Sequence, residues 1–229
     1  MKKDKKAKVV ITKNWPYIVS GNVPLNRDII WTDDEWNSIE WIPWKEIKDL
    51  EEPYALCRCG CSSHKPFCDG SHIKEHFDGT ETASTEPYLN QARKIEWPDL
   101  VLTDAEDLCA VARFCDCCGG IWHLTRHSDD PDNKKMAIKQ ACNCPSGRLT
   151  TWDKKTWEPY EINFDQSISL VEDPAQWVSG PIRMKWWVDL ESESGKIYET
   201  RNRVTLCRCG KSKNKPFCDG SHIPTWFKE

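Results

Sequence analysis

The chain has 229 residues, of which 38% are apolar and 30% charged, so its core is modest for its length and we expect something else to help stabilise it. The unusual counts are thirteen cysteines and thirteen tryptophans. The 32 basic and 36 acidic residues give a net charge of −4, which argues against a nucleic-acid-binding protein, and no apolar run approaches the roughly 18 residues that span a membrane.

The N-terminal residues and the cysteine count together predict a cytoplasmic protein. Residues 1–8 are rich in lysine, and the apolar stretch at 9–11 is too short for a signal peptide, so we expect a solvated tail. Thiols stay reduced in the cytoplasm, and an odd number of cysteines cannot all pair. The cysteines therefore predict metal binding rather than disulfides.

Short strands dominate the predicted elements. Strand-like composition is found at 17–19, 29–31, 54–56, 183–188 and 203–206. Helices are expected at 104–113, with Thr103 or Asp104 as the N-cap, and at 134–141. We expect many of the tryptophans to fill the core, because one large aromatic side chain buries much area. The predicted fold class is therefore α+β and rich in strands.

Two segments of the chain are near-copies of each other. Residues 57–73 read CRCGCSSHKPFCDGSHI and residues 207–223 read CRCGKSKNKPFCDGSHI, which differ at three of 17 positions. Val-Ser-Gly precedes each copy, at 19–21 and at 178–180, but the first interval is nine residues longer. The pattern indicates a duplicated unit whose first copy has a longer loop, and the tryptophan- and acid-rich stretch 31–44 is the candidate insertion.

Each copy contains the pattern C-x-C-x8-C-x3-H, which supplies three thiols and one imidazole. The candidate ligands are Cys57, Cys59, Cys68 and His72 in the first copy, and Cys207, Cys209, Cys218 and His222 in the second. Residues i and i+2 of an extended segment point to the same side, and residues i and i+4 share a face if the segment is helical, here with Pro66 as its start. The spacing leaves two sites open, a structural zinc ion and a [2Fe–2S] cluster.

Both copies resemble the CDGSH iron–sulfur domain of the NEET family, with its pattern C-x-C-x2-(S/T)-x3-P-x-C-D-G-(S/T/A)-H. Ser62, Pro66, Asp69, Gly70 and Ser71 complete the match in the first copy, and the second has the same residues at the equivalent positions. The resemblance implies one [2Fe–2S] cluster per copy, with two cysteines on one iron and Cys plus His on the other. It also implies that the two segments pair as an intramolecular pseudo-dimer around a shared β-rich core, so that a monomer is expected.

The middle of the chain contains six further cysteines. They are Cys109, Cys115, Cys117, Cys118, Cys142 and Cys144. The bacterial ferredoxin motif is C-x2-C-x2-C followed by a distant Cys-Pro. In this chain Ala112 occupies the position of the middle cysteine, so the candidate ligands are Cys109, Cys115 and Cys144. Three thiolates suit a [3Fe–4S] cluster, or a [4Fe–4S] cluster whose fourth ligand is Cys142, Cys117 or Cys118. Residues 100–155 resemble the divergent single-cluster ferredoxin domain, which also ends in CPSG; the alternative is a ferredoxin-like module without a cluster.

These features predict three domains: a CDGSH domain at 1–88, an inserted α+β ferredoxin-like module at 89–158 and a second CDGSH domain at 159–229. We expect electron transfer, or the storage and transfer of clusters, with a redox partner or an apo acceptor of iron–sulfur clusters. The alternative function is a structural interaction module that the metal centres only stabilise. No residue set suits a general base or a nucleophile, so an enzyme is not expected.

Overall fold

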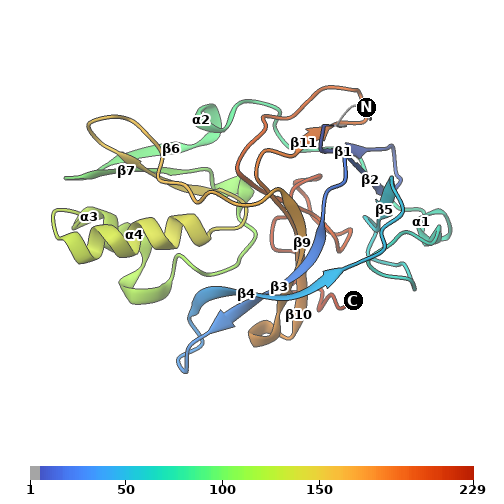
Figure 1. Ribbon diagram of the computed structural model, residues 1–229, viewed down its shortest axis with the longest axis horizontal. Helices are drawn as coiled ribbons and strands as arrows, with labels where there is room; N and C mark the ends of the chain where they lie inside the picture. Colours follow the sequence, from blue (N-terminus) through green and yellow to red (C-terminus); the bar gives the residue numbers. More distant parts are fainter. Residues whose placement is uncertain (1–5) are drawn as a thin grey trace.

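The computed structural model describes residues 6–229, so residues 1–5 of the predicted solvated tail lie outside the description. Within this range the fold is α+β and rich in strands, as the sequence predicts, and the strands form three sheets (Figure 1). None of the helices formed by residues 6–229 is both long and apolar enough to cross a membrane.

The first sheet brings together regions that are far apart in the sequence. Its strand order is β11–β1–β2–β5. The strands are β1 (Lys8–Ile11), β2 (Tyr17–Ser20), β5 (Tyr54–Leu56) and β11 (Asp189–Glu191). β1 pairs antiparallel with β2 and in parallel with β11. Buried residues alternate with half-buried ones along β1 and β2, which is the pattern of strands with one face on a core.

The second sheet also mixes the N-terminal and C-terminal regions, in the order β12–β10–β9–β3–β4. The strands are β3 (Leu25–Thr32), β4 (Ser38–Ile47), β9 (Ser167–Asp173), β10 (Val178–Lys185) and β12 (Arg203–Leu206). β3 pairs in parallel with β9, with Leu25 opposite Ile168. One hydrophobic core collects side chains from both sheets, including Val9, Tyr17 and Leu206. Residues before and after the central segment therefore share a core.

The central segment has its own small sheet and its own core. The strands β6 (Arg93–Glu96), β7 (Leu100–Asp104) and β8 (Leu149–Asp153) pack with the helices α3 (Ile121–Arg126) and α4 (Pro131–Asn143). Leu102, Ile121 and Ala137 are fully buried in this core. The Asp130 side chain caps α4 by accepting hydrogen bonds from the backbone N–H groups of Asp132 and Asn133. The helix predicted at 134–141 is confirmed as part of α4.

Short helical turns complete the described chain. They are α1 (Ser71–Lys74), α2 (Tyr88–Gln91), η1 (Glu106–Leu108), η2 (Cys117–Gly119) and η3 (Pro174–Gln176). In Figure 1, α1 lies at the opposite end of the molecule from α3 and α4.

The helix predicted over 104–113 is wrong. Asp104 is the last residue of β7, η1 provides a single turn, and the residues after it form an irregular loop. Val111 and Arg113 in this loop have φ angles of 55° and 64°, in the left-handed region that a right-handed helix excludes. Contacts with distant residues, described below, override the local helix propensity.

The strand predicted at 183–188 is only partly correct. β10 stops at Lys185, because Trp186 and Trp187 have φ angles of 62° and 52°, which no strand accommodates. The predicted strands at 17–19, 29–31, 54–56 and 203–206 are confirmed within β2, β3, β5 and β12.

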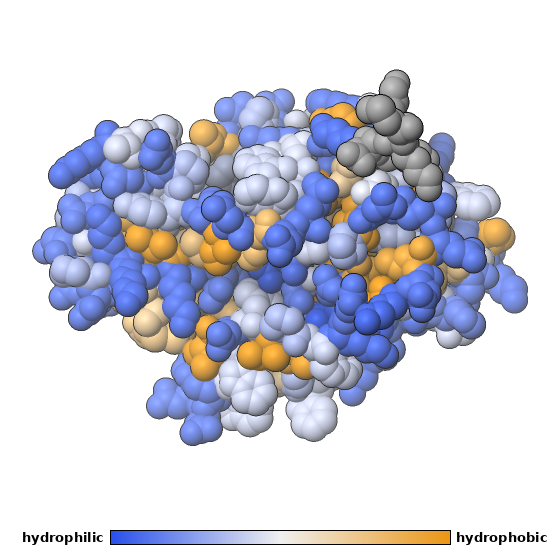
Figure 2. All heavy atoms as spheres, viewed as in Figure 1, coloured by the Kyte–Doolittle hydropathy of each residue, from blue (hydrophilic) through white to orange (hydrophobic). Residues whose placement is uncertain are grey.

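The expectation that tryptophans fill the core is wrong. Eight of the thirteen are exposed, five are half-buried, and none is buried. The stretch 31–44 is no irregular loop but the turn and outer strand of the β3–β4 hairpin, with Trp31, Trp36 and Trp44 exposed. β4 is the edge of its sheet and contains Pro43, so no further strand covers it. Figure 2 shows a largely hydrophilic face with hydrophobic residues only in separate small patches.

Candidate metal centres

The first cysteine motif brings its four predicted ligands together as two pairs. Cys57 and Cys59 follow the end of β5, and their Sγ atoms lie 3.7 Å apart. Cys68 Sγ lies 3.3 Å from Nδ1 of His72. The predicted helix from Pro66 is wrong, because α1 begins only at Ser71. A turn at Gly70, with a φ angle of 87°, brings the imidazole back toward Cys68.

The second motif repeats this geometry without the short helix. The Sγ atoms of Cys207 and Cys209 lie 3.8 Å apart, and Cys218 Sγ lies 3.4 Å from Nδ1 of His222. The backbone around the ligands is also duplicated. The N–H of the first cysteine donates to the proline carbonyl of the motif over 2.8 Å in both copies. Two nearly identical sequences thus produce the same ligand arrangement.

The donor distances fit metal coordination in pairs. Two thiolates on one tetrahedral metal ion, with bonds of about 2.3 Å, lie about 3.8 Å apart. Both C-x-C pairs match this separation. Among residues 6–229 no three Cys, His, Asp or Glu side chains gather around a single point as one metal ion requires. Two donor pairs per motif match what the two irons of a [2Fe–2S] cluster require, one pair for each iron.

Hydrogen bonding favours the thiolate form of one cysteine in each C-x-C pair. The Cys59 thiol and nearby backbone amides lower the pKa of Cys57 to about 6. In the second motif Cys209 has the same effect and lowers the pKa of Cys207 to about 7. The thiolate is the form that binds metals, so each motif loop prepares one ligand in advance.

The two motif loops touch each other reciprocally. A Cβ added to Gly60 would lie 2.5 Å from the carbonyl oxygen of Cys209, and one added to Gly210 would meet the carbonyl oxygen of Cys59 in the same way. Tyr17 of β2 also reaches the second motif, since its hydroxyl donates to the carbonyl of Cys207 over 3.0 Å. Each motif therefore forms part of the packing of the other.

Three of the central cysteines line one small cavity. They are Cys109, Cys115 and Cys144, which the sequence analysis selects as candidate ligands. Cys109 and Cys115 lie on the irregular loop after η1, and Cys144 follows α4. Ala112, at the position of the missing ferredoxin cysteine, lines the same cavity. The structure thus supplies three thiols and a methyl group to this site.

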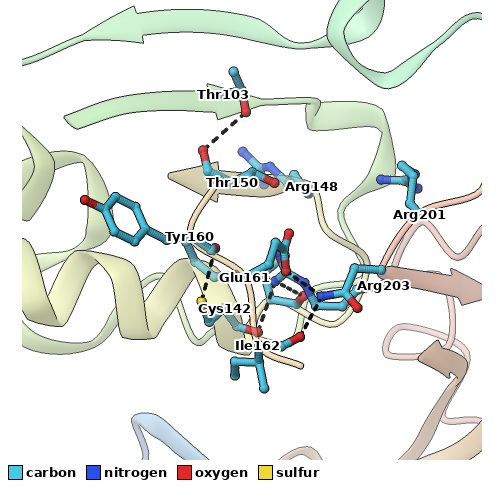
Figure 3. Close-up of polar contacts among 12 residues, drawn as sticks. Thr103, Cys142, Arg148, Thr150, Tyr160, Glu161, Ile162, Arg201 and Arg203 are labelled. Atoms are coloured by element: carbon cyan, nitrogen blue, oxygen red, sulfur yellow. Dashed lines mark hydrogen bonds and ion pairs between the residues drawn. The ribbon is translucent and has the colours of Figure 1, made fainter. Parts of the chain in front are cut away.

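The other central cysteines do not line this cavity. Cys142, named as a possible fourth ligand, turns away, with its Sγ 3.4 Å from the carbonyl oxygen of Tyr160 (Figure 3). Cys117 is buried and Cys118 is exposed, and neither contributes to the lining. Within the described range, no fourth thiol completes the site.

Three arginines that the sequence did not indicate lie around the central cysteine loop, residues 142–147 (Figure 3). Arg203 of β12 donates to the carbonyl oxygens of Cys142 and Cys144 over 3.0 and 2.8 Å. Arg201 donates to the carbonyl oxygen of Ser146 over 3.2 Å. Arg148 lines the cavity itself. The available sequence signals were the position of Arg148 directly after CPSG and the alternation of arginines just before Cys207.

Two of these arginines are paired with carboxylates and one is not. Arg148 forms two hydrogen bonds with Asp104, of 2.6 and 3.0 Å, and Arg203 donates to Glu161 over 2.6 Å. Arg201 has no carboxylate partner within the part of the chain that the structure describes. Its charge is the one near the cysteine loop that no ion pair offsets.

Comparisons with known proteins agree with both resemblances. The family model described as "Iron-binding zinc finger CDGSH type" matches residues 14–73 and 176–223, and the model "Divergent 4Fe-4S mono-cluster" matches residues 95–154. The chain is 45% identical over 69 residues to "CDGSH iron-sulfur domain-containing protein 3, mitochondrial" of Mus musculus, a match that covers 30% of this chain and 44% of that protein. No solved structure matches the chain. These matches support iron–sulfur binding and confirm the resemblances predicted from the sequence.

Proposed function

We propose that this chain, in which two CDGSH-type segments flank a divergent ferredoxin-like segment, binds a [2Fe–2S] cluster in each CDGSH-type motif. The ligands are Cys57, Cys59, Cys68 and His72 for one cluster, and Cys207, Cys209, Cys218 and His222 for the other. The observation that carries the proposal is the duplicated arrangement of two donor pairs, at 3.3 to 3.8 Å, one pair for each iron of a cluster.

The function that follows is single-electron transfer, or the storage and transfer of clusters. A [2Fe–2S] cluster bound by cysteine and histidine supplies one-electron chemistry. The chain holds a thiolate ready in each motif by lowering the pKa of Cys57 and Cys207. Its partner would be a redox protein or an apo acceptor of iron–sulfur clusters.

The same proposal includes a pairing of the two CDGSH-type segments as an intramolecular pseudo-dimer. The reciprocal approach of Gly60 and Gly210, and the parallel pairing of β1 with β11 and of β3 with β9, support it. A monomer is the expected state, to be checked by light scattering on the purified chain.

The central segment is proposed to hold a third cluster on Cys109, Cys115 and Cys144. Because no fourth cysteine among the described residues lines the cavity, the candidates are a [3Fe–4S] cluster and a [4Fe–4S] cluster with a fourth ligand that is not a cysteine. A reducing location such as the cytoplasm suits the chain, because cysteines that bind clusters must be thiolates rather than disulfides.

The test is a metal and sulfide analysis of protein purified without oxygen. Two [2Fe–2S] clusters predict about four iron and four sulfide per chain, and a third cluster raises the iron to about seven or eight. Zinc without sulfide would overturn the proposal. A purely structural role is the second candidate, favoured by the modest core, and reversible bleaching of the visible spectrum by dithionite distinguishes redox-active clusters from structural zinc.

A further inference from the structure

The two CDGSH-type motifs have nearly the same sequence but differ in how far neighbouring residues shield them from solvent, which we call their cover. Cys218 is 2% exposed and Phe217 7% exposed, whereas their counterparts Cys68 and Phe67 are both only half-buried. Since these residues are identical in type and in local backbone, the difference comes from what packs on each motif.

The cover on the second motif is a loop of the central segment, residues 109–115. A Cβ added to Gly220, in the middle of the CDGSH sequence, would clash with Cγ2 of Val111 on this loop. The equivalent Gly70 has nothing within 4 Å of the same position. Val111, itself 37% exposed, therefore lies over the second motif at a point where the first is open.

Two polar contacts fix the cover in place. Asn214 of the second motif donates to the carbonyl oxygen of Asp107 over 2.6 Å. Arg113 forms two hydrogen bonds, of 2.7 and 3.0 Å, with Asp173 at the end of β9. Asp173 is 1% exposed, so this ion pair is shielded from water and holds the loop firmly. Among residues 6–229 no hydrogen bond joins the first motif to the central segment, and Figure 1 shows α1 far from that segment.

The imidazole of the first motif is buried, with His72 6% exposed, but part of what covers it is a single exposed side chain. The ring of Trp15 lies 5.0 Å from the ring of His72, and Trp15 is itself 55% exposed. A tryptophan side chain that exposed is held by few contacts, so it moves aside more readily than a loop anchored by a buried ion pair.

We propose that the N-terminal site is the one that exchanges its cluster with a partner, and that the C-terminal site retains its cluster under the seal of residues 109–115, with Val111 as the closing residue. The inference rests on the proposed function. In the exchange, thiolates of an apo acceptor replace three thiolates and one imidazole as ligands. Protons lost by the acceptor thiols pass to the released groups and to the solvent, and no electron is transferred.

The test mixes the loaded full-length chain with an excess of a four-cysteine apo-ferredoxin and follows the transfer by visible circular dichroism. Two phases of similar amplitude are expected, with the slower at least tenfold slower. The Cys57→Ser/Cys59→Ser variant should lose the fast phase, and Cys207→Ser/Cys209→Ser the slow one. A single phase, or the reverse assignment, would overturn the inference.

Val111→Gly tests the seal directly. Glycine tolerates the φ angle of 55° at this position, so the variant removes the cover without imposing backbone strain. The slow phase should accelerate several-fold and the fast phase should stay unchanged, whereas Val111→Ile, which keeps a β-branched cover, should preserve both phases. An unchanged slow phase in Val111→Gly would refute the seal. A chain that contains no [2Fe–2S] cluster would instead refute the proposed function.

Discussion

The CDGSH-type motifs and the central cysteine site gather their donors in different ways. In the first motif all four ligands lie within residues 57–72, and the loop's own hydrogen bonds place them as pairs at 3.3 to 3.7 Å. In the central site, α3 and α4 separate Cys109 and Cys115 from Cys144, and the three thiols line a cavity without pairing. The CDGSH-type sites therefore depend on local loop geometry, whereas the central site depends on the packing of a whole segment.

The largest expected effect comes from removing a C-x-C pair. Cys57→Ser/Cys59→Ser should lower iron and sulfide by about two each per chain and leave the other sites loaded, because every motif has its own ligands. Iron and sulfide analysis with the visible spectrum measures this. If the variant also lost the C-terminal cluster, the reciprocal contact between the two loops would matter more than local geometry.

Removing Cys144 should affect only the central site. Cys144→Ala is expected to lower the iron content by about three or four while the [2Fe–2S] spectrum persists, since Cys144 is one of three thiols on the cavity. Cys142→Ala is the matched control, because the thiol of Cys142 turns toward Tyr160 and should not matter. Equal loss of iron in both variants would contradict the assignment of ligands.

Acid should loosen the CDGSH-type sites through their histidines. A proton competes with the metal for the same imidazole lone pair, so His72→Cys should slow cluster loss several-fold at about pH 6. Burial lowers the pKa of His222 to about 4. This value is below the usual histidine pKa of about 6.5. The stability that the neutral imidazole of His222 contributes is therefore fully present above about pH 6.5 and is lost progressively as the pH falls toward 4. Visible absorbance during acidification measures the cluster loss; equal decay in parent and His72→Cys would argue against this role of the histidine.

The smallest effect is expected at Arg201, whose charge near the central cysteine loop no ion pair offsets. A positive charge favours the reduced, more negative state of a cluster, so Arg201→Gln should lower the reduction potential of the central site. The expected change is a few-fold in the ratio of reduced to oxidised cluster at a fixed potential. Spectroelectrochemical titration measures it, with Arg201→Lys as the charge-preserving control. If the reduction potential of the CDGSH-type sites changed instead, Arg201 would act on those sites and not on the central one.

What the sequence predicted well was local. The strands that precede the CDGSH-type motifs and the helix at 134–141 all depend on residues close together in the chain. The helix predicted over 104–113 failed because Val111 packs against Gly220 and Arg113 pairs with Asp173, and neither contact is visible in the sequence nearby.

The sequence also did not reveal where the tryptophans and the arginines lie, for a related reason. Composition predicts that large aromatic side chains are buried, but Trp31 and Trp44 lie on a hairpin whose outer strand has no neighbour. Arg203 reaches Cys144 across 59 positions of the sequence. Only the tertiary structure shows that these tryptophans are exposed and that this arginine contacts the central cysteine loop.

The parallel pairings of β1 with β11 and of β3 with β9 have a consequence for synthesis on the ribosome. Strands near the N-terminus must wait for partners translated more than a hundred residues later, such as Ile168 for Leu25. The central segment has its own core and its own antiparallel sheet, so it can fold while the first cysteines are still without their sheet partners. During that interval the thiols of the first motif lie beside incomplete sheets and are exposed to oxidants.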